Sequence, residues 1–230
     1  MTSTQELLAR FERLSSGILT SLPEGERETN YDHIAPLYDL VVGNGIYNRL
    51  IWGCPKRAYR DAATTFFERV QSGPIIDFGC GSLVFTAASY RGEEDHTVLF
   101  DLSRRMLERG QKRLPSGHFL QGDALDPPFD QHCFAGAMSW GMLHIFGTGA
   151  AYLSRLKKVV KPGGVIALGT LVLADRALGD RWLHALYKRG EAAAPQTVHQ
   201  VTKGFEQYFT LESSELCGNM LFLFGHRGYT

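Results

Sequence analysis

The residue types best suited to chemistry stand in one short run, Asp77-Phe78-Gly79-Cys80-Gly81-Ser82. Two glycines one residue apart let the backbone approach a ligand without a Cβ clash. The run directly follows the apolar pair Ile75-Ile76. In open α/β sheets, ligands bind just past the carboxyl ends of the strands. The pattern therefore predicts a ligand-contacting loop that Asp77 orders.

Two other glycine-loop chemistries fit this run poorly. A dinucleotide-binding loop needs a third glycine where Val84 stands, because that position allows close packing of helix and strand. A P-loop needs a Gly-Lys-Ser/Thr sequence, which does not follow the run. Both a nicotinamide-dependent oxidoreductase and a P-loop nucleotidase are therefore disfavoured.

Short apolar runs alternate with helical patterns along the middle of the chain. Buried strands are expected at residues 75–78, 97–102, 118–120, 134–138 and 165–173. Helices are expected at residues 56–70, 86–90, 103–114 and 150–160. This alternation predicts an α/β fold with a Rossmann-like, doubly wound and mostly parallel sheet. Runs 209–216 and 220–224, joined by Gly218-Asn219, predict an antiparallel hairpin at the edge of the sheet.

The chain divides into two expected parts. Residues 1–55 are expected to form a helical lid rich in aromatic side chains, with a loop at 15–28. Residues 56–230 are expected to form the sheet domain, with a helical insertion at about 174–205 that covers a binding crevice. Ser3 and Glu6 match a capping box at the first helix.

Composition narrows the class of protein. The 230 residues are 44% hydrophobic, as in an ordinary globular chain, and carry 24 basic and 24 acidic side chains. Zero net charge disfavours a nucleic-acid partner. Four cysteines without a C-x-x-C pair disfavour a metal site and favour a reducing, cytoplasmic location. The longest apolar stretch, 163–174, is too short to span a membrane.

Four segments resemble motifs of the class I S-adenosylmethionine-dependent methyltransferases, in the order of that family. They are Asp77-Phe78-Gly79-Cys80-Gly81, residues 100–107 (FDLSRRML), Gln121-Gly122-Asp123-Ala124 and residues 156–164 (LKKVVKPGG). Residues 31–39 also resemble the N-terminal lid of the small-molecule branch. The chain departs from the family at Leu83, the place of a third loop glycine, and at Ala135, commonly an acidic position.

The resemblance implies a site for S-adenosylmethionine, whose product form is S-adenosylhomocysteine. The cofactor-binding residues that it implies are Tyr38, Asp77, Gly79, Cys80, Gly81, Asp101, Leu102, Met106, Asp123, Ala124, Ser139 and Trp140.

Each implied role has a structural alternative. Asp101 would accept hydrogen bonds from both ribose hydroxyls, or would only cap the next helix. Asp123 would accept the adenine amine while Leu102 and Met106 cover the adenine face, although Met106 also fits the core. Cys80 fits a buried filler better than a nucleophile.

Two residues are candidates for catalysis. His144 follows the fourth strand, and histidine can take a proton near neutral pH, although a half-buried packing role is the alternative. Tyr31 is the candidate from the lid, with aromatic packing as its alternative. His184 and His199 are weaker candidates, and no metal site is expected.

The predicted function is methyl transfer to an O, N or S atom of a small molecule by in-line displacement. An apolar acceptor pocket is expected from aromatic and aliphatic residues of the lid and insertion, namely Trp52, Trp182, Leu183, Leu186 and Tyr187. A methyltransferase acting on RNA or protein is one alternative. A cofactor-binding scaffold without catalysis is another, since fold does not fix function.

Overall fold

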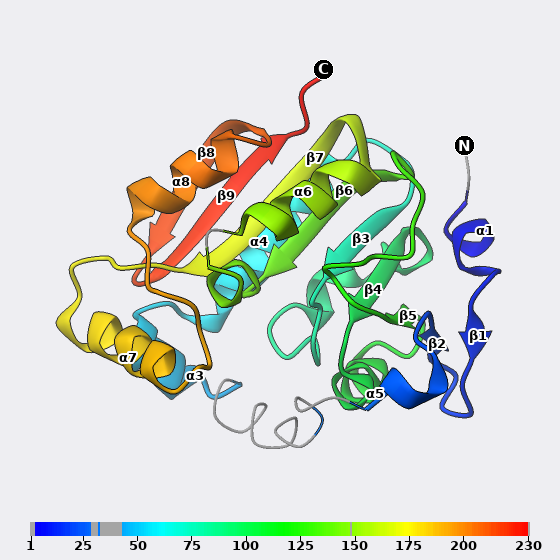
Figure 1. Cartoon of the computed structure of the whole chain (residues 1–230), viewed down its shortest axis with the longest axis horizontal. Helices are drawn as coiled ribbons and strands as arrows, with labels where there is room; N and C mark the ends of the chain where they lie inside the picture. The colour runs from blue at the N-terminus through cyan, green and yellow to red at the C-terminus, as the bar shows by residue number, and fades with distance from the viewer. Residues whose placement is uncertain (1–2, 29–31, 33–42, 148, 230) are drawn as a thin grey trace.

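The structure is a computed structural model that describes residues 3–28, 32, 43–147 and 149–229. Within these residues nine strands form one sheet in the order β1-β2-β5-β4-β3-β6-β7-β9-β8 (Figure 1). The strands from β2 to β7 pair in parallel, while β1, β8 and β9 pair antiparallel to their neighbours. The predicted doubly wound α/β sheet is confirmed.

The central strands lie where the buried apolar runs predict them. They are β3 (Ile75–Phe78), β4 (Thr97–Asp101), β5 (His118–Gln121), β6 (Phe134–Trp140) and β7 (Val160–Leu171). The predicted hairpin is formed by β8 (Thr210–Cys217) and β9 (Met220–His226). Strand β7 begins earlier than expected, because Gly163 continues the pairing through a bond from its N–H to the Arg227 carbonyl, 2.8 Å.

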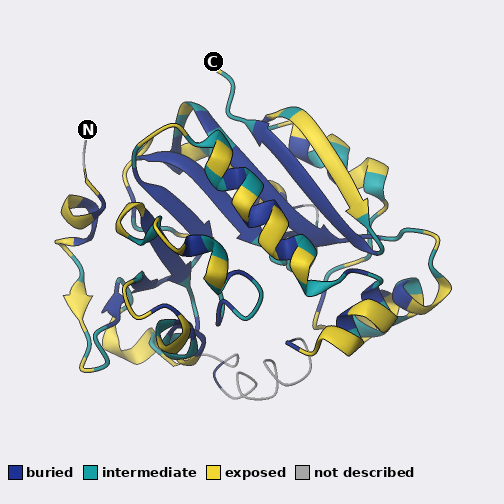
Figure 2. Cartoon of the chain, turned by 180° about the vertical axis from the view of Figure 1, so that it is seen from behind, coloured by how far each residue is buried: buried dark blue, intermediate teal, exposed yellow. Residues whose placement is uncertain are grey.

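Helices cover both faces of the sheet (Figure 2). Residues of α1 (Thr4–Leu8), α6 (Ala150–Val159) and α8 (Val198–Glu206) join one apolar core. Residues of α4 (Lys56–Arg69), α5 (Arg104–Arg113) and α7 (Ala177–Lys188) join the other. The 3-10 helices η1 (Glu24–Glu26), η3 (Ala87–Tyr90), η4 (Glu94–His96) and η5 (Leu143–Ile145) complete the connections.

The N-terminal segment differs from the expected helical lid. Strands β1 (Glu12–Arg13) and β2 (Leu19–Thr20) extend the sheet beside β5, so the loop expected at 15–28 is wrong in part. The capping box of Ser3 and Glu6 at α1 is confirmed. Of the described N-terminal elements, α3 (Gly45–Tyr47) and the π-helical turn η2 (Asn48–Trp52) lie beside the insertion, where η2 meets α7 and Tyr47 contacts Trp182. The division of the chain at residue 55 stays a prediction.

The chain order creates a crevice at the carboxyl edge of the sheet. From β3 the chain moves outward through β4 to β5, then returns to β6 on the other side of β3. Loops after β3 and β6 diverge at such a point, which is where open α/β sheets bind ligands.

Candidate functional site

The glycine loop leaves β3 at this crevice. The N–H groups of Gly79 and Cys80 both donate to the Phe100 carbonyl, at 2.8 and 3.2 Å, so the loop is held against β4. Gly79 and Gly81 have φ of +70° and +57°, which glycine adopts without strain. A Cβ at Gly81 would meet nothing within 4 Å, so open space faces the loop there.

Leu83 stands where the family has a third loop glycine, and its backbone still forms a turn there. Its φ is +58°, a left-handed conformation that costs a non-glycine residue about 1–2 kcal/mol. Burial of its side chain at 2% exposure in the core around α4 and α5 offsets that strain. The chain after Leu83 forms turns and then η3, so the helix expected at residues 86–90 is a 3-10 helix rather than an α-helix.

Asp101 ties the glycine loop to the end of β4. Its Oδ2 accepts from the Gly81 N–H and its Oδ1 from the Ser103 N–H, both at 2.8 Å. The pKa of Asp101 is raised to about 6. Burial is the largest cause and the charge of Asp32 adds to it, while the hydrogen bonds from Ser103 and Gly81 lower the pKa. Each oxygen keeps a second lone pair, so the carboxylate can still accept from a diol.

Asp77 lies deeper than Asp101. It is fully buried, its Oδ2 accepts the Tyr90 hydroxyl proton, and its Oδ1 has no partner among the described residues. Burial raises the pKa of Asp77 to about 7; the Tyr90 hydrogen bond opposes this and the charge of Asp101 adds to it. The structure thus places Asp77 under the loop, bonded to η3 and not to the loop itself.

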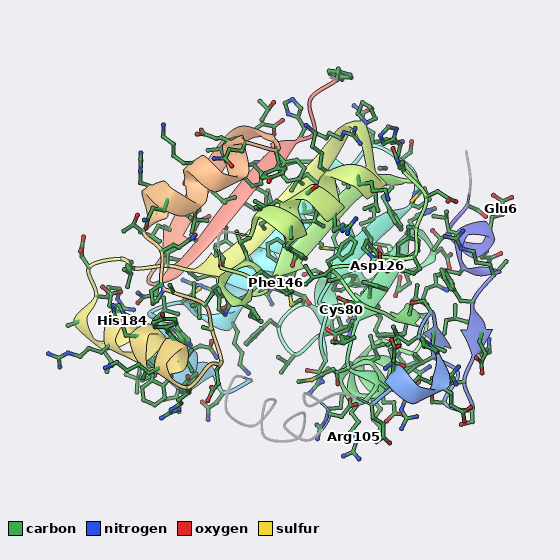
Figure 3. All side chains as sticks on the ribbon, in the orientation of Figure 1. Glu6, Cys80, Arg105, Asp126, Phe146 and His184 are labelled. Atoms are coloured by element: carbon green, nitrogen blue, oxygen red, sulfur yellow. The ribbon has the colours of Figure 1, made fainter. Side chains whose placement is uncertain are left out.

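Cys80 lies at the carboxyl end of β3, near the middle of the molecule (Figure 3). Burial raises the pKa of its thiol, and the charges of Asp101 and Asp77 raise it further. Such a thiol stays protonated at neutral pH, which supports the filler role over the nucleophile.

The loops after β4 and β5 lie beside Asp101. Met106 is buried at the start of α5, and its N–H donates to the Ser103 hydroxyl, 3.2 Å. Leu102 is half-buried. Asp123 accepts the Leu125 N–H at Oδ1, 2.8 Å, while Ala124 packs in the core.

The last two residues of β6, Ser139 and Trp140, place their side chains on opposite faces of the sheet. Ser139 is buried and accepts the Tyr152 hydroxyl proton at 2.6 Å, so its side chain is used by the core. Trp140 contacts Phe222 edge to face on the other side, and its buried indole N–H has no partner among the described residues. Met142 lies across Gly79, because a Cβ there would come within 2.4 Å of its Cγ and Sδ atoms.

His144 lines a pocket under the insertion. Its Nδ1 lies 3.4 Å from the Thr170 hydroxyl and accepts the Leu171 N–H at 3.5 Å. Burial lowers the pKa of His144 to about 4, so the ring is neutral over most of the pH range. The other lining residues are mostly small or apolar, namely Leu143, Gly147, Leu171, Leu183, Ala193, Ala194, Pro195, Gln196 and Val201.

Several expected site residues lie elsewhere. Tyr31 and Tyr38 fall outside the described residues. Trp52 and Trp182 each pack edge to face on Tyr47, which joins η2 to α7. His184 lies on α7, apart from Cys80 (Figure 3).

The remaining four expected residues of the insertion lie in different surroundings. Leu183 lines the pocket of His144. Leu186 packs against the apolar core that contains residues of α4, α5 and α7, and Tyr187 is exposed. His199 lies on α8.

The departure at Ala135 agrees with the burial of this position. Its side chain is buried 3.2 Å from where a Cβ of Gly73 would lie, and its carbonyl oxygen approaches Gly164 closely. An acidic side chain would lose its hydration here. Among the described residues, no group of three His, Cys, Asp or Glu side chains is placed to hold a metal ion. Of the described helices, none is long and apolar enough to cross a membrane.

The residues present fit a bound nucleoside at this edge. Gly81 opens on free space, Asp101 offers paired acceptor oxygens beside it, and the Trp140 N–H is an unused buried donor. Asp32, Gln121, Met142 and Thr170 were not predicted as site residues. Asp32 and Gln121 carried a sequence signal, through their places in the lid motif and in the third family motif.

Comparison with known proteins agrees with this geometry. Residues 75–164 match the family model described as "Methyltransferase domain". A demethylmenaquinone methyltransferase of Clavibacter sepedonicus is 29% identical over 194 residues, which cover 83% of this chain and 75% of that protein. Other curated relatives align over 44% to 60% of their own length.

Solved structures share the fold. Geranyl diphosphate C-methyltransferase from Streptomyces coelicolor, in complex with Mg2+, geranyl diphosphate and S-adenosylhomocysteine, has a TM-score of 0.60 at 13% identity over 80% of this chain and 85% of that one. The [4+2]-cyclase SpnF has a TM-score of 0.63 at 14% identity, over 87% and 95% of the two chains.

The chain resembles the class I S-adenosylmethionine-dependent methyltransferases in the sequence of residues 75–164 and in the fold of its sheet. These similarities support an enzyme, and S-adenosylmethionine is the cofactor of the methyltransferases that it resembles.

Proposed function

We propose that the protein transfers a methyl group from S-adenosylmethionine to a small, largely apolar acceptor held in the pocket of His144. The observation that carries the proposal is the pairing of two unlike sites at one sheet edge. A loop and carboxylate suited to a nucleoside lie at β3 and β4. A pocket of about 10 Å³, lined mostly by small and apolar side chains, lies past β6 and β7 and would have to widen to hold an acceptor.

The cofactor residues have distinct roles in this proposal. When bound, S-adenosylmethionine supplies an electrophilic methyl group. Asp101 accepts the ribose hydroxyls. The loop of Gly79, Cys80 and Gly81 brings backbone close to the ligand at Gly81, because Met142 lies across Gly79. Leu102 and Met106 border the adenine, with Asp123 and Ala124 at its edge. Asp77 and Ser139 support the loop and strand from beneath, and Trp140 borders the donor through its indole N–H.

His144 is the proposed base in the acceptor pocket. Burial lowers its pKa to about 4, so its ring is neutral; Nδ1 is the acceptor nitrogen, and it would take the proton of an acceptor hydroxyl in place of its 3.5 Å hydrogen bond from the Leu171 N–H. Tyr31 and Tyr38 remain proposed as lid contacts.

The acceptor is proposed to be of the quinol type. When a ring hydroxyl loses its proton to His144, its oxygen or a ring carbon becomes nucleophilic. Carbon is therefore proposed as an acceptor atom in addition to the O, N and S atoms predicted from the sequence. The Clavibacter relative is named for demethylmenaquinone, which supports this class. The four free cysteines still favour a cytoplasmic location.

A second candidate is a cofactor-binding protein that does not transfer a methyl group, because SpnF, a protein of similar fold, is named as a [4+2]-cyclase. The test is a labelled-methyl assay with unsubstituted 1,4-naphthohydroquinone, kept reduced, beside RNA and a protein extract as rival acceptors. We expect label in the naphthohydroquinone. Binding of S-adenosylhomocysteine without label in any acceptor would favour the second candidate, and label only in RNA or protein would exclude a small acceptor.

A further inference from the structure

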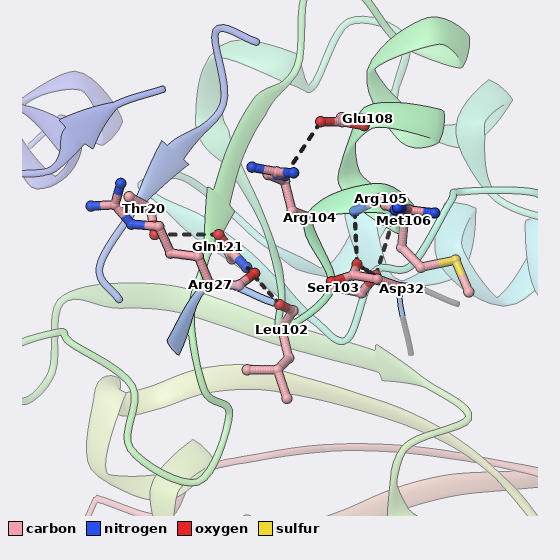
Figure 4. A network of polar contacts seen from close by, with 10 residues as sticks. All are labelled: Thr20, Arg27, Asp32, Leu102, Ser103, Arg104, Arg105, Met106, Glu108 and Gln121. Atoms are coloured by element: carbon pink, nitrogen blue, oxygen red, sulfur yellow. Dashed lines mark hydrogen bonds and ion pairs between the residues drawn. The ribbon is translucent and has the colours of Figure 1, made fainter. Parts of the chain in front are cut away.

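One buried amide joins the N-terminal segment to the loop after β4. Gln121 is fully buried at the end of β5, and its Nε2 donates to the Leu102 carbonyl at 3.0 Å and the Arg27 carbonyl at 2.7 Å (Figure 4). Its Oε1 accepts the Thr20 hydroxyl proton at 3.4 Å. Residues on both sides of this amide are therefore held in fixed relative positions.

A buried carboxylate makes the second connection. Asp32 is 6% exposed, and its Oδ1 accepts from the Ser103 hydroxyl at 2.6 Å and the Arg105 N–H at 3.1 Å (Figure 4). The Ser103 N–H in turn donates to Asp101 Oδ1. Asp32 thus reaches Asp101 through one intervening residue.

The two connections flank a single stretch of chain. Gln121 fixes the carbonyl of Leu102, and Asp32 fixes Ser103 and the first turn of α5. That stretch contains the groups proposed to contact the nucleoside, from Asp101 to Met106. The bonds come from residues that lie 19 and 71 positions away in sequence.

We propose that Asp32 and Gln121 are positioning residues that hold residues 101–106 in the shape that binds the nucleoside end of the cofactor. This inference rests on the proposed function, in which these residues form the nucleoside site. It makes the N-terminal segment part of cofactor recognition, in addition to any contact with the acceptor.

The charge of Asp32 gives the role a separate signature. It is one of the causes that raise the pKa of Asp101. Among the described residues, other titratable groups that interact with Asp101 are Asp77 of β3, Cys80 of the loop after it and Tyr152 of α6. Asparagine at position 32 keeps an acceptor oxygen for Ser103 and Arg105 while it removes this charge.

The test measures the Kd of S-adenosylhomocysteine and of 5′-methylthioadenosine, which carries only the nucleoside end, by calorimetry between pH 5 and 8. For Asp32→Ala we expect both ligands to bind about tenfold more weakly at pH 8, the loss typical of removing a charged acceptor. Asp32→Asn should bind both within about twofold of the wild type at pH 8, since its hydrogen bonds persist. Its loss of affinity on acidification should begin at lower pH, because Asp101 stays ionised to lower pH.

Glu108→Gln is the matched control, because Glu108 lies on the same helix and forms an ion pair along its surface with Arg104, 3.5 Å. It should leave both Kd values unchanged. Gln121→Met should weaken both ligands alike, and thermal unfolding of each variant shows that it is folded at the assay temperature.

Three results overturn the inference. They are an unchanged Kd in Asp32→Ala, a loss for S-adenosylhomocysteine without a loss for 5′-methylthioadenosine, and an Asp32→Asn profile that coincides with the wild type. Failure of the wild type to bind either ligand would instead overturn the proposed function.

Discussion

The carboxyl edge of the sheet has two unlike halves. At the ends of β3 and β4, polar groups are fixed by hydrogen bonds to the backbone, as in the two bonds from Gly81 and Ser103 to Asp101. Past β6 and β7 the pocket is lined by small and apolar side chains around His144 and Thr170. The first half is preorganised to hold a hydroxyl-rich ligand, and the second is suited to an apolar molecule with one proton to lose.

Substitution of His144 should give the largest effect on turnover without an effect on cofactor binding, and so should distinguish the two halves most strongly. For His144→Ala we expect turnover to fall about a hundredfold, the contribution of a positioned general base, with the Kd of S-adenosylhomocysteine unchanged. Because burial lowers the pKa of His144 to about 4, the wild-type rate should stay level down to mildly acidic pH and fall only near pH 4. Steady-state kinetics with the labelled cofactor measure both effects.

His184→Ala is the control, since His184 is exposed on α7. A wild-type rate in His144→Ala would leave that residue a packing role and move the base elsewhere.

Substitution of Asp101 tests the other half. Asp101→Ala should weaken cofactor binding by about 1–3 kcal/mol, because a charged acceptor is lost. The rate at saturating cofactor should change less than the affinity. Calorimetry with S-adenosylhomocysteine measures the affinity, and Asp95→Ala, at an exposed carboxylate on η4, is the control. If Asp101→Ala binds as tightly as the wild type, the nucleoside contacts lie elsewhere.

The sequence predicted the central fold well because buried parallel strands are continuous apolar runs. Residues 75–78 match β3 residue for residue. The strands β1 and β2 were missed because each has only two residues, and those of β1 are both exposed. Their pairing depends on the free edge of β5, which no local pattern reveals.

The site was predictable only where a motif carried it. The glycine loop and Asp101 come from local patterns and are brought together by the Gly81–Asp101 bond. The contacts of Asp32 with Ser103 and of His144 with Thr170 join distant segments, 71 and 26 positions apart. Such contacts follow from tertiary packing, so single-sequence reasoning could name His144 but not its surroundings.

Asp77 lies under the border between the halves, and its pH behaviour shows whether it serves the fold or the ligand. Its pKa is raised from 3.8 to about 7 by burial, so the folded protein binds more protons than the unfolded chain between about pH 4 and 7. The stability that Asp77 contributes is therefore present below pH 4 and is lost as the pH rises toward 7. Asp77→Asn cannot ionise and should lose this dependence.

The measurement is the thermal midpoint of both proteins from pH 4 to 8. The wild type should fall by several degrees relative to Asp77→Asn, at about 2–4 °C per kcal/mol for a chain of this size, and the difference should level off above pH 7. His144 acts in the opposite sense in the same window, because its lowered pKa makes stability rise with pH, but it is present in both proteins and cancels. Parallel curves would mean that Asp77 is ionised in the folded protein, and its unpaired Oδ1 would then need a cationic partner such as the amino group of the cofactor. A ligand-dependent change in the difference curve would assign Asp77 to the cofactor half rather than to the support beneath both halves.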